Sequence, residues 1–188
     1  MHIKSTNDDS ASTRANQEST EIVLNEIKPQ KYRSDKNQDF QIRIKVFQAR
    51  QLDGNNISPR CSIKCSNATK YTKTMKSTNS PFWDEVFFFN FISSEKELFK
   101  DNIEFAILDY SGSAFSRNEL IGSFVTDIGF IYDEPGHSII HKWLLLSDPE
   151  DNNAGAKGYL NVTVNVLGPG DEVPLVSIKY FYFMSLIL

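Results

Sequence analysis

Residues 40–46, FQIRIKV, alternate apolar side chains with polar or charged ones without a break. A period of two puts every second side chain on the same face of a strand, so this segment predicts a strand with one buried face. Residues 159–166 repeat the pattern, with Leu160, Val162, Val164 and Val166 on the apolar side. The chain therefore begins and ends its ordered part with half-buried strands.

Six further segments between these two also read as strands. In residues 61–65 the apolar phase holds Cys61, Ile63 and Cys65, opposite Ser62 and Lys64. In residues 86–91, Phe87, Phe89 and Phe91 point one way and Val86 and Phe88 the other, which predicts burial on both faces and a place at the centre of the core. The other strands are predicted at residues 70–76, 103–107, 120–126 and 139–146. Eight short strands separated by loops rich in Gly, Pro, Asn and Ser indicate an all-β, antiparallel sandwich.

One short helical turn interrupts the strands. Ser94 and Glu97 have the spacing of a capping box, in which the serine oxygen accepts a free backbone N–H and the glutamate reaches back. We expect the turn at residues 95–100.

The two ends of the chain differ from its middle. Residues 1–37 are polar, so they predict a flexible, disordered leader or an interdomain linker. They lack the basic start and apolar run of a secretory signal, which favours a cytosolic protein. Residues 175–188 are apolar except for Ser177, Lys179 and Ser185. This run is shorter than the roughly 20 residues of a membrane-spanning helix. We expect a truncated or alternatively spliced end; lying in a membrane interface or packing on the sandwich are the alternatives.

Cys61 and Cys65 are the only cysteines. Four residues apart in a strand, their Cα atoms would be roughly 13 Å apart, which is beyond the reach of a disulfide. They are predicted to be small buried side chains or edge positions.

The charge of the chain is unevenly distributed. A net charge of -4 and a pI near 5.4 disfavour a nucleic-acid-binding protein that relies on global positive charge. Between Gly54 and Trp83, however, there is no Asp or Glu. The cations of this stretch are Arg60, Lys64, Lys70, Lys73 and Lys76.

Two sets of residues carry a family resemblance. Residues 78–89, TNSPFWDEVFFF, resemble the turn and aromatic strand that mark C2 domains. The ordered segments 129–137, 142–149, 158–160 and 167–172 resemble the second C2 domain of the ferlins. This resemblance implies a C2 domain over residues 38–174, in a fragment or short isoform of a protein that acts in vesicle fusion, membrane repair and trafficking.

The resemblance also implies where calcium would bind. C2 domains that bind calcium use about five acidic positions in two loops, because Ca²⁺ prefers six to eight oxygen ligands. Asp53, Asp109 and Glu119 can fill three of them, whereas Ser58 and Ser111 stand where aspartates are usual. We expect a weak calcium site or none, with Asp53 and Asp109 capping their loops instead.

The resemblance gives the basic stretch a different meaning. Lysines on the concave strands of C2 domains bind acidic phospholipids, and each lysine near an anionic bilayer contributes about 1 kcal/mol. Lys64, Lys70, Lys73 and Lys76 are the candidates, although alternation in a strand would turn Lys73 away from Lys70 and Lys76. An ordinary solvated strand face is the alternative reading.

The sequence gives little indication of an enzyme. His137 and His141 lack the glutamate and the helix of a zinc-binding H-E-x-x-H motif. Phosphate-binding and nucleophile-elbow motifs are missing as well, so a catalytic role would need a lipase or kinase domain outside these residues. A protein-binding or structural C2 domain remains the alternative function, carried by Phe115 and the 132–137 loop.

Overall fold

The computed structural model describes residues 31–110, 118–151 and 153–172. The chain divides into two units, residues 1–32 and 33–188, and the strands and helices all belong to the second within the described ranges. Residues 1–30 of the predicted leader 1–37, and the apolar segment 175–188, lie outside the described residues.

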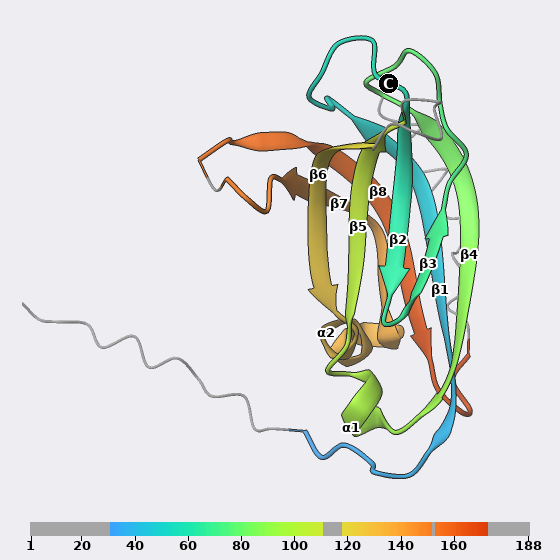
Figure 1. Cartoon of the computed structure of the whole chain (residues 1–188). Helices are drawn as coiled ribbons and strands as arrows, with labels where there is room; N and C mark the ends of the chain where they lie inside the picture. The colour runs from blue at the N-terminus through green and yellow to red at the C-terminus, as the bar shows by residue number, and fades with distance from the viewer. Residues whose placement is uncertain (1–30, 111–117, 152, 173–188) are drawn as a thin grey trace, which may run out of the picture. The chain divides into compact units, whose positions relative to one another are not determined.

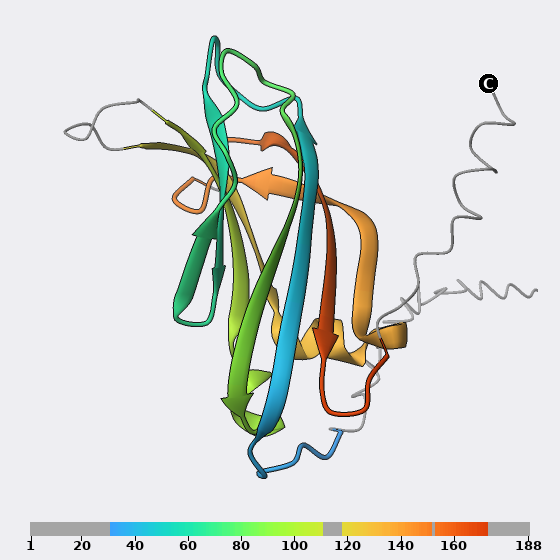
Figure 2. The same ribbon diagram turned by 90° about the vertical axis from the view of Figure 1, so that its right-hand side faces the viewer.

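Eight antiparallel strands build this unit (Figures 1 and 2). They follow the order β3-β2-β5-β6-β7-β8-β1-β4, and β6 meets β7 through the single residue pair Ser123–Ser147. The sheet therefore folds into two layers, β3-β2-β5-β6 and β7-β8-β1-β4. The strands are β1 (Gln38–Arg50), β2 (Pro59–Cys65), β3 (Ala68–Tyr71), β4 (Phe82–Ser93), β5 (Asn102–Asp109), β6 (Glu119–Asp127), β7 (Ser138–Ser147) and β8 (Ala156–Leu167).

The core lies between the layers, as the alternation predicts. β1 buries Phe40, Ile42, Ile44 and Val46, and its neighbour in the same layer, β8, buries every second residue from Leu160 to Val166. A fully buried aliphatic side chain contributes about 1.5–3 kcal/mol, so these rows supply much of the driving force for folding. The predicted all-β antiparallel sandwich is confirmed.

The prediction for residues 86–91 is wrong. β4 pairs only with β1 at one end of the strand order, and the side chains of its outward row are exposed to solvent. Val86 is 48% and Phe88 45% exposed, whereas Phe89 on the inward row is 3% exposed. The aromatic run predicted a central strand because side-chain type alone does not reveal whether a second layer covers the outer face.

The strand predicted at residues 70–76 ends early, at Tyr71. Thr72 turns inward, and its Oγ1 accepts the backbone N–H of Cys61 at 2.9 Å. The next N–H, that of Lys73, donates to the Glu85 carboxylate instead of to a neighbouring strand. Alternation within a strand therefore does not determine where the side chains of Lys73 and Lys76 point.

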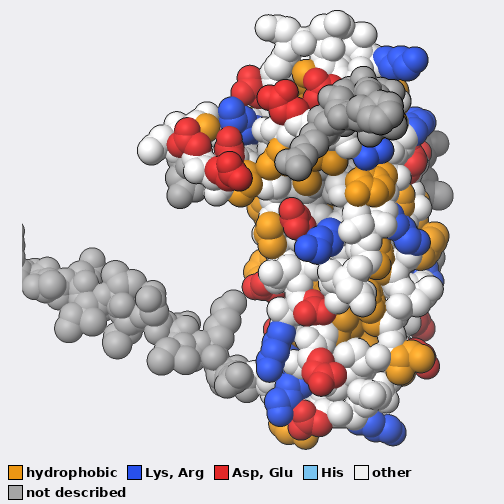
Figure 3. Space-filling view, viewed as in Figure 1, with side chains coloured by type: hydrophobic (Ala, Val, Ile, Leu, Met, Phe, Trp, Pro, Cys, Tyr) orange, Lys and Arg blue, Asp and Glu red, His pale blue; other side chains and the backbone are white. Residues whose placement is uncertain are grey.

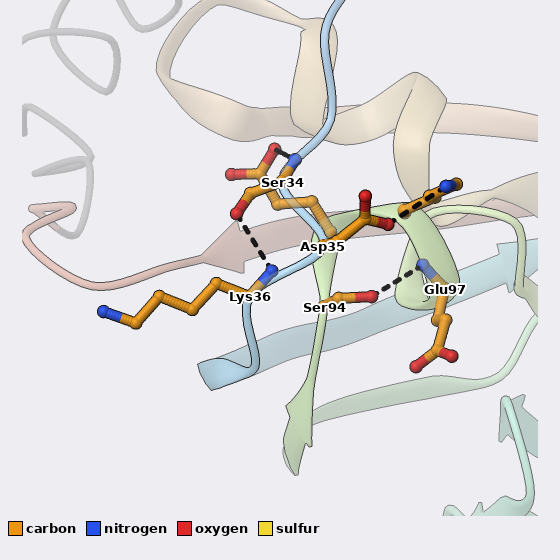
Figure 4. A network of polar contacts seen from close by, with 7 residues as sticks. Ser34, Asp35, Lys36, Ser94 and Glu97 are labelled. Carbon is orange, nitrogen blue, oxygen red and sulfur yellow. Dashed lines mark hydrogen bonds and ion pairs between the residues drawn. The ribbon is translucent and has the colours of Figure 1, made fainter.

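Three short helices complete the fold. α1 (Glu95–Leu98) lies within the predicted turn, and Ser94 Oγ accepts the N–H of Glu97 at 3.3 Å, which confirms the serine half of the capping box. The chain before β1 packs here as well, because Ser34 N donates to Glu95 and Lys96 pairs with Asp35 (Figure 4). α2 (Ile128–Asp133) and the 3-10 turn η1 (Pro135–His137) replace most of the predicted 132–137 loop.

Tyr132 explains why this segment is not a free loop. Its ring packs on Phe40, Phe99 and His137, and Arg33 lies over it. His137 Nδ1 in turn lies 3.0 Å from Asp171 Oδ2. Within the described ranges, none of the helices is both long and apolar enough to cross a bilayer.

Candidate functional site

The first candidate site is the basic segment, residues 60–76, which runs through β2 and β3 and beyond. Side chains of β2 alternate strictly, so Cys61, Ile63 and Cys65 are buried while Lys64 is exposed on the outer face. Thr69 and Tyr71 of β3 share this outer face, because they pair with Lys64 and Ser62. The outer face of the β2–β3 hairpin is therefore polar and positively charged.

The structure separates the four predicted lysines. Lys70 pairs with the buried Ile63, so it leaves the strand on the opposite side from Lys64. Its ammonium donates to the carbonyl of Phe88 at 2.8 Å and lies 5.3 Å from the centre of the Phe89 ring. Lys73 and Lys76 are exposed in the connection between β3 and β4. Lys64 and Lys70 thus do not share one strand face.

Arg60 adds a positive charge to the outer face of the β2–β3 hairpin. Its guanidinium carbon lies 4.4 Å from the centre of the Tyr71 ring and 4.8 Å from that of Tyr110. Stacking on two rings holds the charge in place at little entropic cost. Its Nε is buried and finds no hydrogen-bond partner within the described part of the chain. Sequence reasoning places Arg60 in the basic stretch but does not select it as a site residue; the available signal is its i, i+4 spacing to Lys64.

Acidic groups limit the positive charge here. Glu104 of β5 stands opposite Lys64 in the strand ladder, and the Glu85 carboxylate accepts the N–H of Lys73. The basic segment is consequently a modest positive surface in an acidic chain. Figure 3 shows Lys and Arg side chains spread along the right-hand part of the face on which β3 and β4 lie.

The second candidate site is the loop cleft at one end of the sandwich. It is a cavity of about 370 Å³, lined by residues at or near the ends of β1, β5, β6, β7 and β8. The structure brings the three predicted carboxylates of Asp53, Asp109 and Glu119 together in this cleft. Two further charged residues, Asp148 and Lys157, line it as well. Acidic side chains gather at this upper end in Figure 3.

Each of two carboxylates in the loop cleft already has a protein partner. Asp109 Oδ1 accepts the N–H of Ser58 at 2.7 Å, so it fixes the loop that precedes β2. Asp53 Oδ2 lies 2.9 Å from the ammonium of Lys157. The hydrogen bond and charge of Lys157 lower the pKa of Asp53 below its usual value of 3.8, and Asp53 in turn raises the pKa of Lys157 above 10.5.

Within the described ranges, this donor set offers a calcium ion few free carboxylate oxygens. Calcium needs several free carboxylate oxygens converging on one point. In the loop cleft, one of the three predicted ligands binds an ammonium, another binds a backbone N–H, and Ser58 adds no charge. Across the described ranges, no three His, Cys, Asp or Glu side chains lie close enough together to hold a metal ion. Ser111 and Phe115 lie outside the described residues.

Sequence reasoning missed Lys157 and Asp148. Lys157 is 104 positions from Asp53 in the sequence, and its spacing from neighbouring residues gave no sign of this contact. Asp148 carried a weak signal, since an acidic residue directly after a strand can reach the end of a sandwich. The two histidines are apart and differently placed, with the His141 ring 4.3 Å from that of Phe47 and the His137 ring on Tyr132.

Comparisons with known proteins show the family to which the chain belongs. Residues 40–146 match the C2 domain family, and residues 147–180 match the family described as FerI (NUC094) domain. The chain is 43% identical over 162 residues to myoferlin of Xenopus tropicalis and 46% identical over 141 residues to myoferlin of Homo sapiens. These alignments cover 85% and 75% of this chain but only 8% and 7% of those proteins.

Solved structures agree on the fold. The chain superimposes on a multidomain structure of extended synaptotagmin 2 with a TM-score of 0.57 at 16% identity, covering 70% of this chain and 28% of that one. A calcium-bound structure of the two C2 domains of extended synaptotagmin 2 gives a TM-score of 0.54 at 19% identity, covering 73% and 48%. At these identities the likeness concerns the fold alone.

Proposed function

Because the chain belongs to the ferlin family of C2 domain proteins, we propose that it is a non-catalytic module that binds membranes rich in acidic phospholipids, with weak or no dependence on calcium. It acts at the cytosolic surface of membranes, as part of the trafficking, fusion or repair machinery that the ferlin resemblance implies. The observation that carries this proposal is the cationic outer face of the β2–β3 hairpin, with Arg60 held between Tyr71 and Tyr110.

The cations of the basic segment differ in how much positive charge they present to a membrane. Arg60 and Lys64 lie on one strand face and form the centre of the proposed contact. Lys73 and Lys76 are exposed beyond β3 and add charge at its margin. Lys70 contributes less, because its ammonium already binds the Phe88 carbonyl. Tyr71 and Tyr110 place amphipathic rings beside Arg60, as aromatic residues do at membrane interfaces.

Vesicle sedimentation tests the proposal. Each cation near an anionic bilayer contributes about 1 kcal/mol, so neutralising Arg60 and Lys64 together with Arg60→Gln and Lys64→Gln lowers the partition coefficient roughly thirtyfold. The measurement uses phosphatidylserine or phosphoinositide vesicles at low salt in the absence of calcium. Lys100→Gln and Lys142→Gln, two exposed lysines outside the basic segment, form the matched control and leave binding unchanged. Equal loss in both double variants would refute a localised contact.

A protein-binding function is the second candidate, favoured by one observation. The outward row of β4 exposes Phe82 (58%), Val86, Phe88 and Ile92 (78%) along one side of a strand that pairs with β1 alone. Exposed apolar rows on edge strands mark contact surfaces for other chains. If wild-type protein stays in the supernatant with acidic vesicles at low salt, this candidate replaces the first. Ile92→Asp is then the variant that weakens binding to a partner.

A further inference from the structure

Lys157 is joined to Asp53 at two points. Its ammonium donates to Asp53 Oδ2 at 2.9 Å, and its backbone carbonyl accepts the N–H of Asp53 at 3.1 Å. Lys157 lies in β8 next to the start of the strand, whereas Asp53 lies in the loop after β1. The two bonds therefore tie a loop of the cleft to the rigid sheet.

The packing around Lys157 directs its side chain into the loop cleft. A Cβ atom on Gly122 of β6 would lie 2.7 Å from the Cβ of Lys157 and 3.2 Å from that of Leu146. Any residue larger than glycine at this position would collide with the lysine stem. The Lys157 side chain is accordingly 19% exposed, while that of Asp53 is 62% exposed. A side chain held in this way loses less entropy on pairing than a free surface lysine.

Several acidic groups act on this one ammonium. Asp53 raises the pKa of Lys157 most, through its hydrogen bond and charge, and Asp148 and Asp151 raise it further. The loop cleft thus concentrates negative charge around Lys157, as a calcium-binding cleft concentrates it around an ion. Lys157 remains protonated throughout the physiological pH range.

We infer that Lys157 is a built-in counterion, which supplies in the loop cleft the positive charge that a calcium ion would otherwise supply and thereby excludes the ion. An ammonium fixed among the carboxylates repels a divalent cation and removes Asp53 from the set of free ligands. This inference concerns the loop cleft alone. It does not depend on whether the basic segment binds lipid.

Calcium titration of the full chain by calorimetry tests it. The wild type shows no saturable calcium binding up to about 1 mM, the weak end of the range for calcium sites. Lys157→Met keeps the apolar stem, removes the charge and frees the exposed Asp53 carboxylate to turn toward Asp109 and Glu119, so it gains a saturable site that binds calcium at least tenfold more tightly than the wild type. Lys157→Arg keeps the charge and behaves like the wild type. Lys100→Met, which removes a lysine outside the cleft, is the matched control and also gains nothing.

Two results would overturn the inference. One is a folded Lys157→Met variant that shows no more calcium binding than the wild type. The other is a wild type that binds calcium more tightly than the variant. Adding Asp53→Asn to Lys157→Met removes the gained affinity if the gain arises at this cleft. A gain that survives Asp53→Asn belongs to another site and contradicts the assignment.

A second measurement covers the case in which Lys157→Met does not fold. NMR detection of the lysine ammonium groups follows the titration of Lys157 in the wild type and in Asp53→Asn. Because Asp53 raises the pKa of Lys157, Asp53→Asn lowers the pH at which Lys157 loses its proton. No response of Lys157 to Asp53→Asn would contradict the contact on which the inference rests.

Discussion

Cys61 and Cys65 show what alternation predicts at the scale of single residues. Both thiols are free and buried, because they share the inward phase of β2 with Ile63. The prediction of small buried side chains without a disulfide is confirmed. Lys157 is the opposite case, since its partner is set by which loops meet at the end of the sandwich. Local spacing decides the phase of a residue within its strand, and topology decides which distant residue it contacts.

The buried cysteines give a prediction about reactivity. Burial raises the pKa of the Cys65 thiol to about 12 and also raises that of Cys61, with smaller contributions from Asp101 and Glu85 respectively. The reactive thiolate is therefore scarce and inaccessible at neutral pH. We expect iodoacetamide to modify the native chain at pH 8 roughly 100-fold more slowly than the urea-unfolded chain, as followed by mass spectrometry. Equal rates would show that β2 does not bury these residues.

β4 shows the limits of sequence reasoning at the scale of elements. Its aromatic residues identified a strand correctly but not its position, because an apolar side chain can lie on an exposed outer face. The neighbouring β3 was predicted too long for a related reason, since the inward turn of Thr72 and the bond from Lys73 to Glu85 depend on other strands. Strand existence follows from local pattern; strand ends and burial follow from the assembled sheet.

Two adjacent phenylalanines in β4 test its orientation. Phe89 is 3% exposed and packs in the core, so Phe89→Ala should lower the free energy of unfolding by about 3–5 kcal/mol. Phe88 faces outward, with the Arg43 guanidinium carbon 5.7 Å from its ring centre, so Phe88→Ala should cost about 1 kcal/mol or less. Urea unfolding of both variants measures the difference. Similar losses would mean that β4 is covered on both faces after all.

At the scale of the whole molecule, the sandwich carries two charged regions in different places. The basic segment exposes Arg60 and Lys64 on the outer face of one layer, and the loop cleft pairs its acidic side chains internally, with Lys157 among them. The fold class, the alternating burial in β1, β2 and β8, and most residues of both regions were predictable from alternation and resemblance. Only the three-dimensional structure shows that Lys70 and Lys64 lie on opposite sides of the hairpin, that Arg60 lies over Tyr71 and Tyr110, and that Lys157 pairs with Asp53.

In the proposed function, surface charge, and not a captured ion, attaches this module to membranes. The most direct measurement is the binding of the wild-type chain to phosphatidylserine vesicles, with calcium and with a chelator, at two salt concentrations. We predict equal binding with and without calcium, and binding that weakens as salt rises, because salt screens exposed charges. Binding that requires calcium and does not weaken as salt rises would contradict attachment by surface charge.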